Sequence, residues 1–512
     1  MSGPVERSAP GVRLAVTLAV VTIVVGALLL PGLGDGSLQG DEAIYGSVAL
    51  DSSASGGGIH LELDGRSYVN KPPLLFWLLE LSFGIFGGST WSARLPGALA
   101  GFAVAWWIVL EGYRRRALAP GAFVAVLVLS TPVALGLAGD RSFRDVCTDS
   151  LLTLCVVLCL GSWGRWIAGR KPRALRYCIL FCALGALAKG YLAPAFLVLA
   201  LAAFLLARTT RPADPAEPRA AVVRGSLLAI GSGLAVSALW LAALELDGAT
   251  RVWQRVVAKN IWQRWTEGID PAHLQGPLYY GERIFGDFGG WLLLLIPAVA
   301  RISRESAAER ERSFPAGFAG ALFVLLAIVS FSIPVSKLPW YLLPVYPILG
   351  LVLARGIEEV GERLRDRRVR ALAFAVLTIC LGVRVAGAYR ALQPSGSDAR
   401  APLLRELEAI DPRGELPVYL GPELGFGAPA GGLGAEEYFF VHSRKGVRRE
   451  LPPRLGGRRG CALLLSADAA ALAAIPGVRA AEIRRVERPR PDVGPLWLVE
   501  GCPGGAIPAS GQ

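Results

Sequence analysis

Charged residues are scarce in this sequence. Asp, Glu, Lys and Arg together make up 18% of the 512 residues, whereas 53% are hydrophobic. Soluble domains carry about 25% charged residues, so this composition excludes an ordinary soluble protein and indicates repeated membrane-spanning segments. The mean hydropathy of +0.46 agrees with that interpretation.

Histidine is nearly absent, with only His60, His273 and His442. Their spacing is not typical of a metal site, so the sequence predicts no definite cofactor and leaves only a divalent metal ion open. Of the eight cysteines, six lie in or beside apolar segments, where a free thiol serves as a small packing residue. Cys461 and Cys502 flank expected strands in a segment that we place in an oxidising compartment, which makes them candidates for a disulfide.

No clear small-residue cleavage site follows the first apolar run. Residues 14–30 hold no charge and come directly after Arg13, which predicts an uncleaved first membrane span rather than a removed signal peptide. A crossing helix needs roughly 20 residues. Further apolar segments predict crossings at about 94–112, 119–138, 150–167, 176–188, 191–207, 225–244, 289–300, 315–333, 338–354 and 371–389.

Lys and Arg gather in alternate loops between these segments. The expected cytoplasmic pieces are residues 1–13, 113–118, 168–175, 208–224, 301–314 and 355–370. The positive-inside rule then predicts about 11 to 13 membrane helices, with the N-terminus inside and the C-terminus outside. Basic cytoplasmic loops also account for the net charge of +12, so no nucleic-acid partner is predicted.

Two apolar stretches do not fit simple crossings. "KPPLLFWLLELSFGIFG" (71–87) is short and opens with two prolines, so we expect a re-entrant or interfacial helix. "RVWQRVVAKNIWQRW" (251–265) repeats Trp, Val and Ile every four residues with basic residues between them. That pattern is typical of a helix lying in the membrane interface, the alternative being a surface helix that packs its apolar stripe on the core.

The character of the sequence changes near residue 391. Apolar runs become short: "LPVYLG", "CALLLS" and "PLWLVEG" predict strands, and "APLLRELEAI" and "ADAAALAAI" predict helices. The expected organisation is a polytopic α-helical membrane domain at 1–390, followed by a small extracytoplasmic α/β domain at 391–512.

Polar residues collect where the topology places the outer ends of the helices. The candidates are Asp41, Glu42, Lys71, Arg144, Asp149, Lys189 and Lys337. Lysines can hold an anionic phosphate as compact point charges, and a carboxylate can take a proton from an attacking hydroxyl or amine. Outside the cytoplasm nucleotide sugars and ATP are not supplied, so such a reaction needs an activated donor, for example a sugar on a polyprenyl phosphate.

Each candidate also has a simpler structural explanation. Lys189 or Lys337 alone could be a lysine that snorkels from a helix end toward water. Asp149 alone could cap the following helix, and Asp41 with Glu42 could be a solvated loop pair. Their expected placement on one face makes those separate explanations weaker, but a transporter that only binds its cargo fits the same placement.

The motifs themselves resemble a known family. In order along the chain they are "GDEAIYG", "YVNKPPLLFWLLELSFGIFG", "SARLPGALAGF", "TDSLLTLC", "GALAKGYLA" and "SKLPWYLLPVYPILGL". This series resembles the GT-C fold transferases that use lipid-phosphate sugars, over about residues 10–390. It is most similar to the aminoarabinose transferases of lipid A and more distantly similar to the protein O-mannosyltransferases.

The resemblance implies an inverting transfer from a polyprenyl-phosphate sugar. Asp41 matches the family's essential first-loop aspartate and would be the base, with Glu42 orienting it or binding the acceptor. Tyr45 completes that motif, Lys71 matches the lysine associated with the carrier phosphate, and Asp149 matches the second essential aspartate. Further positions near the donor are matched by Lys189, Lys337 and Tyr341, whereas Arg144 is a binding candidate by position alone.

We therefore expect a glycosyltransferase that lies in the cell inner membrane, in contact with membrane lipids, and works on the extracytoplasmic face. The expected donor is a polyprenyl-phosphate sugar, and the acceptor is a lipid A-like lipid, another glycan or a protein. A transporter or flippase for a lipid-linked sugar is the alternative, and only turnover of the donor separates the two classes.

Overall fold

The computed structural model describes most of the helical region and the ordered elements that follow it. The described residues are 10–137, 142–210, 219–246, 248, 252, 254–268, 271–306, 309, 313–393, 402–411, 416–421, 424, 426, 433, 435–444, 447–448, 451–452, 462–476, 478, 483–486 and 496–501.

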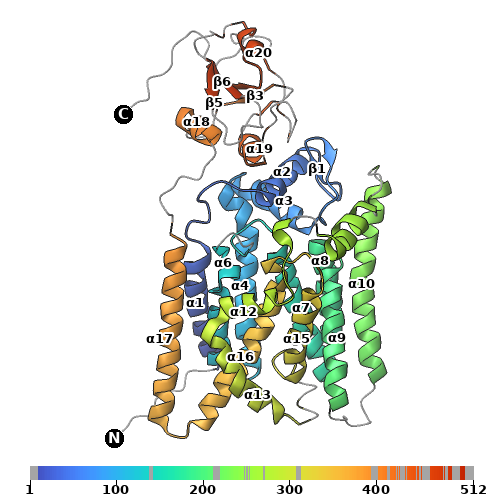
Figure 1. The fold of residues 1–512 in the computed structure, drawn as a ribbon, viewed down its shortest axis with the longest axis vertical. Coiled ribbons are helices and arrows are strands. Elements are labelled where there is room, and N and C mark those ends of the chain that lie inside the picture. Colours follow the sequence, from blue (N-terminus) through green and yellow to red (C-terminus); the bar gives the residue numbers. More distant parts are fainter. Residues whose placement is uncertain are drawn as a thin grey trace. The chain divides into compact units, whose positions relative to one another are not determined.

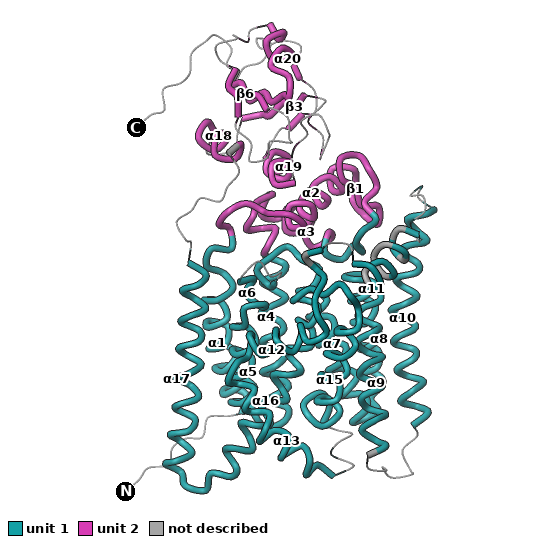
Figure 2. Tube along the Cα trace, viewed as in Figure 1, with its two compact units in different colours: residues 1–33, 69–75, 95–393 teal, residues 34–68, 76–94, 394–512 magenta. Residues whose placement is uncertain are grey.

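The chain divides into two compact units, coloured separately in Figure 2. Unit 1 comprises residues 1–33, 69–75 and 95–393, and unit 2 comprises residues 34–68, 76–94 and 394–512. The C-terminal segment that we expected to form a domain of its own therefore shares a unit with most of the first loop.

Unit 1 is a bundle of helices (Figure 1). Within the described residues, eight helical segments are long and apolar enough to cross a membrane. They are Pro10–Leu29 (α1), Thr90–Arg114 (α4), Thr148–Gly169 (α7), Leu192–Thr209 in α9, Arg219–Leu246 (α10), Tyr279–Ser303, Pro339–Arg363 and Arg367–Ala391 (α17). Shorter helices of the bundle are α5 (Leu118–Leu129), α6 (Pro132–Leu135), α8 (Pro172–Lys189) and α15 (Phe318–Ser332). The segment 279–303 contains α12 (Tyr279–Phe288) and α13 (Leu295–Ser303), and α16 spans Tyr346–Arg363.

This architecture confirms the predicted polytopic helical fold, and a helix is present at every expected crossing. The crossing expected at 119–138 is not one continuous helix, because α5 ends before Ser130 and α6 starts at Pro132. Proline has no N–H to continue a helix but suits the first helical position. Thr131 caps the new helix by accepting a hydrogen bond from the backbone N–H of Ala134 at 3.4 Å.

Asp287 of α12 is a carboxylate buried inside unit 1, with 2% of its surface exposed. Tyr346 donates its hydroxyl hydrogen to Oδ2 of Asp287 at 2.5 Å, and Arg283 lies one helical turn away at 3.7 Å. Arg384 of α17 donates to the Asp287 carbonyl at 2.6 Å and to the hydroxyl of Ser130 at 3.0 Å. Buried polar groups are costly unless paired, so this cluster fastens α17 to the bundle.

The two stretches that did not fit simple crossings have different outcomes. The "LLFWLLELSFGIF" part of the first forms α3 (Leu74–Phe86), whose 13 residues reach only about 20 Å and cannot cross about 30 Å of hydrocarbon. The second is helical, as expected, but forms a π-helix at Gln254–Gln263 followed by one α-helical turn. Trp262 and Trp265 are exposed at 67% and 46%, and the interfacial position stays a prediction.

Unit 2 contains the short strands and helices expected after residue 391. Its four-stranded sheet has the order β3 (Val418–Leu420), β4 (Ala462–Ser466), β6 (Leu496–Gly501) and β5 (Arg484–Val486), with β3 and β4 parallel and the other pairs antiparallel. The helices are α18 (Pro402–Ile410), α19 (Ala435–His442) and α20 (Ala469–Ala473). The first loop adds α2 (Asp41–Ala54), α3 from residue 76 on, and the hairpin of β1 (Glu62–Leu63) and β2 (Arg66–Ser67). Cys461 and Cys502 lie outside the described residues, so their pairing stays a prediction.

Candidate active site

The acid pair of the first loop forms the start of helix α2. Gly40 precedes the helix with φ of 52°, a backbone conformation that glycine adopts without strain. Asp41 and Glu42 then occupy the first turn. The N-terminal end of a helix carries a partial positive charge, so two carboxylates are electrostatically favoured there.

Glu42 is held by an arginine that the sequence analysis did not assign to the site. Arg94 donates from Nε to Oε1 of Glu42 at 3.0 Å and from a terminal nitrogen to Oε2 at 2.9 Å. The same guanidinium donates to the backbone carbonyl of Asp35 at 3.0 Å and to that of Ser37 at 3.3 Å. This two-pronged geometry is the strong form of an arginine–carboxylate pair, so Glu42 is fixed in place.

Asp41 has a different partner. The hydroxyl of Tyr45, one helical turn later, donates to Oδ2 of Asp41 at 3.2 Å. Tyr45 is 4% exposed, and its ring meets the edge of Phe76 with centroids 5.9 Å apart. This hydrogen bond helps to orient the Asp41 carboxylate, whereas Glu42 beside it pairs with the Arg94 guanidinium.

Asp149 and Lys189 form a buried ion pair in unit 1. Lys189 Nζ donates to Oδ1 of Asp149 at 2.5 Å, with side-chain exposures of 13% and 4%. Asp149 lies in the first turn of α7 and Lys189 is the last residue of α8, two helices packed against each other. Each charge therefore also complements the dipole of its own helix end.

Tyr341 and Lys337, which were both expected near the donor, lie close together in the sequence of unit 1. The ring of Tyr341 lies 4.7 Å from Lys189 Nζ, a cation–π contact. Lys337 is 4% exposed and donates from Nζ to the carbonyls of Gln275 at 2.9 Å and Pro334 at 2.7 Å. Burial of the Lys337 ammonium lowers its pKa below the ordinary lysine value.

Arg144 and Lys71 complete the predicted residues. The guanidinium of Arg144 donates to the carbonyls of Leu28 at 2.8 Å, Leu29 at 3.1 Å and Pro31 at 2.7 Å. These carbonyls lie at the C-terminal end of α1, where a cation both caps the helix and complements its dipole. Lys71 is half-buried and immediately precedes the two prolines before α3.

The structure thus brings the predicted residues together in two groups. In unit 2, Asp41, Glu42 and Tyr45 share one helix, with Arg94 as a further member. In unit 1, Asp149 and Lys189 are joined to Tyr341. Arg94 could have been noted from the "SARLPG" motif, which already carried part of the resemblance. Within the described residues, no group of three or more His, Cys, Asp or Glu side chains could hold a metal ion.

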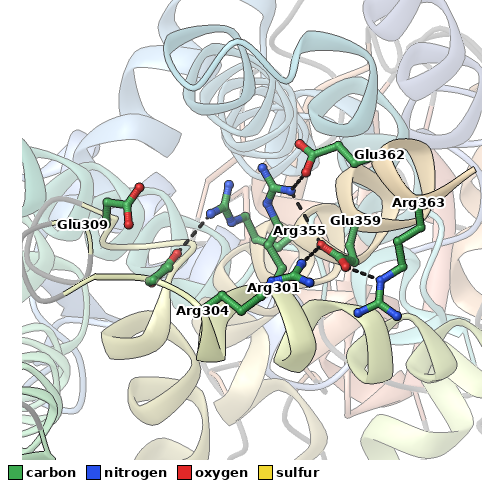
Figure 3. A pocket seen from close by; sticks show the side chains of 8 residues that line it. Arg301, Arg304, Glu309, Arg355, Glu359, Glu362 and Arg363 are labelled. Atoms are coloured by element: carbon green, nitrogen blue, oxygen red, sulfur yellow. Dashed lines mark hydrogen bonds and ion pairs between the residues drawn. The ribbon is translucent and has the colours of Figure 1, made fainter. Parts of the chain in front are cut away.

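A separate charged hollow of about 410 Å³ lies in unit 1 and contains none of the predicted site residues. Figure 3 shows its arginines and glutamates directed toward one another. Its lining residues are Arg301, Arg304, Glu305, Glu309, Arg355, Glu359, Glu362 and Arg363. Arg355 pairs with Glu305 at 3.0 Å, and Glu359 accepts hydrogen bonds from both Arg304 and Arg363. The paired charges clamp α13 to α16 rather than forming an anion site.

The buried pair predicts a specific stability pattern. Replacing Lys189 by Met leaves the Asp149 carboxylate buried without its counter-charge, which typically costs roughly 3–5 kcal/mol. We therefore expect a clearly lowered unfolding transition for Lys189→Met in detergent, and recovery of much of that loss in the Asp149→Asn, Lys189→Met double variant. Lys171→Met is the matched control, because Lys171 is exposed just before α8. An unfolding transition of Lys189→Met equal to that of the control would contradict the pairing.

Comparison with known proteins agrees with this picture. Residues 70–230 match the family model of dolichyl-phosphate-mannose-protein mannosyltransferases. The chain is 27% identical over 343 residues, or 65% of its length, to the undecaprenyl phosphate-alpha-4-amino-4-deoxy-L-arabinose arabinosyl transferase 1 of Pseudomonas fluorescens. It is 27% identical over 391 residues, or 73% of its length, to the arabinosyl transferase with the same donor in its name from Pectobacterium carotovorum. The chain spans 57% of the length of the first relative and 66% of the second.

A solved structure matches nearly the whole chain. The crystal structure of ArnT from Cupriavidus metallidurans bound to undecaprenyl phosphate is similar over 98% of this chain and 100% of that chain, with a TM-score of 0.64 and 17% identity. Its apo state matches with a TM-score of 0.61. The likeness at this identity is one of fold. The chain is therefore a multi-pass membrane protein with the GT-C fold, related in sequence to arabinosyl transferases named for an undecaprenyl-phosphate sugar.

Proposed function

We propose that this chain is an inverting membrane glycosyltransferase that moves a sugar from a polyprenyl-phosphate carrier to an acceptor outside the cytoplasm. The observation that carries this proposal is the sequence similarity to the arabinosyl transferases, which extends over 65% and 73% of the chain. Their names give an undecaprenyl-phosphate aminoarabinose as donor. A related lipid-linked pentose or hexose is the donor class proposed here.

Asp41 is the proposed general base. In the transfer, the acceptor hydroxyl or amine loses its proton to Asp41 and forms a bond to the anomeric carbon of the sugar. The bond between that carbon and the carrier phosphate oxygen breaks on the opposite side, which inverts the configuration. The hydrogen bond from Tyr45 helps to hold the Asp41 carboxylate in one orientation for the proton transfer.

Glu42 is proposed to position Asp41 rather than to exchange protons itself. Its two oxygens accept hydrogen bonds from Arg94, so both are engaged within the protein. The ion pair instead fixes the first turn of α2. Of the two roles expected for Glu42, orienting the base therefore has more support than binding the acceptor.

Basic residues are proposed to bind the phosphate that leaves with the carrier. Lys71, Lys189 and Lys337 are the candidates, and a monoester phosphate stabilised by ammonium groups needs no dedicated acid to leave. Asp149 and the ring of Tyr341 hold Lys189 in place, so Asp149 acts through that lysine. Arg144, which caps α1, is proposed to shape the loop that precedes Asp149.

The acceptor is proposed to be a lipid A-like lipid, a glycan or a protein. A transporter for the lipid-linked sugar remains the second candidate function, since binding residues alone fit both. Incubation of the purified protein with radiolabelled polyprenyl-phosphate aminoarabinose and envelope lipids separates the two, because only a transferase converts the donor into carrier phosphate and glycosylated product.

Asp41→Asn tests the base. The amide keeps the shape and hydrogen bonding of the side chain but cannot accept the proton, and general-base catalysis contributes about 10²–10⁴-fold. We expect turnover to fall by that factor while donor binding, measured by retention of labelled donor on the purified protein, stays near the wild-type value. Asp35→Asn is the control, because Asp35 lies just before the helix and is not a proposed base. Wild-type turnover in Asp41→Asn would reject Asp41 as the base.

Lys71→Ala tests the phosphate contact. Removing the ammonium should weaken donor binding severely, and Lys71→Arg should restore it only in part because the two cations differ in shape. The unfolding transition should change little, since a half-buried lysine adds little packing. Donor affinity near the wild-type value in folded Lys71→Ala would remove Lys71 from the donor site.

The proposed orientation places the basic loops in the cytoplasm and the segment after residue 391 outside, in a cell inner membrane. The charge difference between alternate loops supports it. A cysteine introduced at the exposed Arg405 should react with a membrane-impermeant thiol reagent added to intact cells, whereas one introduced at the exposed Arg368 should react only after the membrane is opened. The opposite labelling pattern would reverse the topology.

A further inference from the structure

Helix α19 of the C-terminal segment packs directly on helix α2 within unit 2. α2 carries Asp41, Glu42 and Tyr45, and α19 lies almost 400 residues later in the sequence. The contact surface of α19 is strongly buried, with Tyr438 at 0% and Phe439 at 3% exposure.

The contact is closest at Gly46, the residue after Tyr45. A Cβ added at Gly46 would lie 2.6 Å and 2.7 Å from two ring carbons of Phe439, and 3.1 Å from a methyl carbon of Leu38. No side chain larger than hydrogen fits there without moving the ring. The Phe439 ring also packs near Phe83 of α3, with centroids 6.1 Å apart. The ring is thus wedged between two helices, and glycine lets α2 approach it.

Hydrogen bonds fasten α2 on both sides of this contact. Just before the helix, the hydroxyl of Ser37 donates to Glu436 of α19, while the carbonyl of Ser37 accepts from Arg94. Toward the end of the helix, the hydroxyl of Tyr438 donates to Oδ2 of Asp51 at 2.8 Å. α19 therefore contacts the α2 region at three points, and Asp41 lies between the first and the second.

We propose, resting on the proposed function, that α19 is a positioning element for the general base, with Phe439 against Gly46 setting where α2 presents Asp41. The C-terminal segment then belongs to the catalytic apparatus without touching substrate. A misplacement of about 1 Å at a reacting group can cost about 10²-fold in rate. A change in the contact between Phe439 and Gly46 that shifts α2 by this distance is therefore enough to slow the reaction.

Gly46→Ala is the first test variant. Alanine is a better helix former than glycine, so α2 itself is not weakened, but the added methyl group collides with Phe439. We expect kcat to fall by about 10-fold or more with the KM for the donor unchanged, and faster amide hydrogen exchange in residues 41–54. The matched control is Gly84→Ala in α3 of the same unit, where an added Cβ has nothing within 4 Å.

Phe439→Leu provides the rescue. A smaller side chain at 439 makes room for the methyl group, so the Gly46→Ala, Phe439→Leu double variant should regain most of the lost turnover and the slow exchange of α2. A merely destabilising effect of Gly46→Ala would lower the unfolding transition and the amount of folded protein, while kcat per folded molecule would stay at the wild-type value.

The outcomes separate this inference from the proposed function. If the wild type turns over the donor but Gly46→Ala has the wild-type kcat and the wild-type amide exchange, the positioning role is overturned. The proposed transferase function is then unaffected. Failure of the double variant to recover also overturns the positioning role. If the wild type does not turn over the donor, the proposed function and the catalytic role of α19 are both overturned. Amide hydrogen exchange in Gly46→Ala then tests the packing contact alone: faster exchange establishes the contact, and unchanged exchange rejects it.

Discussion

The arrangement of this protein depends on the cost of taking a charge out of water. A chain with more than half of its residues hydrophobic can fold as a membrane bundle only if each charge that it buries meets a partner. Asp149 with Lys189 and Asp287 with Tyr346 are solutions to this requirement. Both also fix where helices meet, because each pair joins two helices. Pairing of a buried charge therefore does two things here: it offsets the cost of removing the charge from water, and it fixes the relative position of two helices.

The same requirement distinguishes two adjacent carboxylates. Glu42 accepts two hydrogen bonds from the Arg94 guanidinium, whereas Asp41 accepts a hydrogen bond from the phenolic hydroxyl of Tyr45. Adjacent residues on a helix point about 100° apart, so the two neighbouring carboxylates have different surroundings. In the proposed reaction Glu42 therefore has a structural task, and the proton transfer is assigned to Asp41.

Much of the fold could be predicted from the sequence, because long apolar runs between basic loops have few other solutions in a bilayer. The strands "LPVYLG" and "CALLLS" were also predictable from their short apolar runs. The π-helix at Gln254–Gln263 was not, since its apolar spacing is close to that of an α-helix. Arg94 stands in a motif that carries the resemblance, but its partner Glu42, 52 positions away, could not be predicted. The cap that Arg144 forms on α1, more than 110 positions away, could not be predicted either. The periodicity of a sequence carries no information on which distant segments pack together, so the packing of the first loop with the C-terminal segment is seen only in the structure.

The packing of α19 on α2 has a consequence for how the protein is made. Tyr438 is synthesised 387 residues after its partner Asp51, a delay of roughly 20 to 80 s at about 5–20 residues per second. During that interval the helix bearing Asp41 has been translated but its late partner has not. Unit 2 is completed only after the segment with α19 has been translated, so a chain that terminates before α19 would insert its membrane helices yet lack the part of the fold that gives α2 its final place.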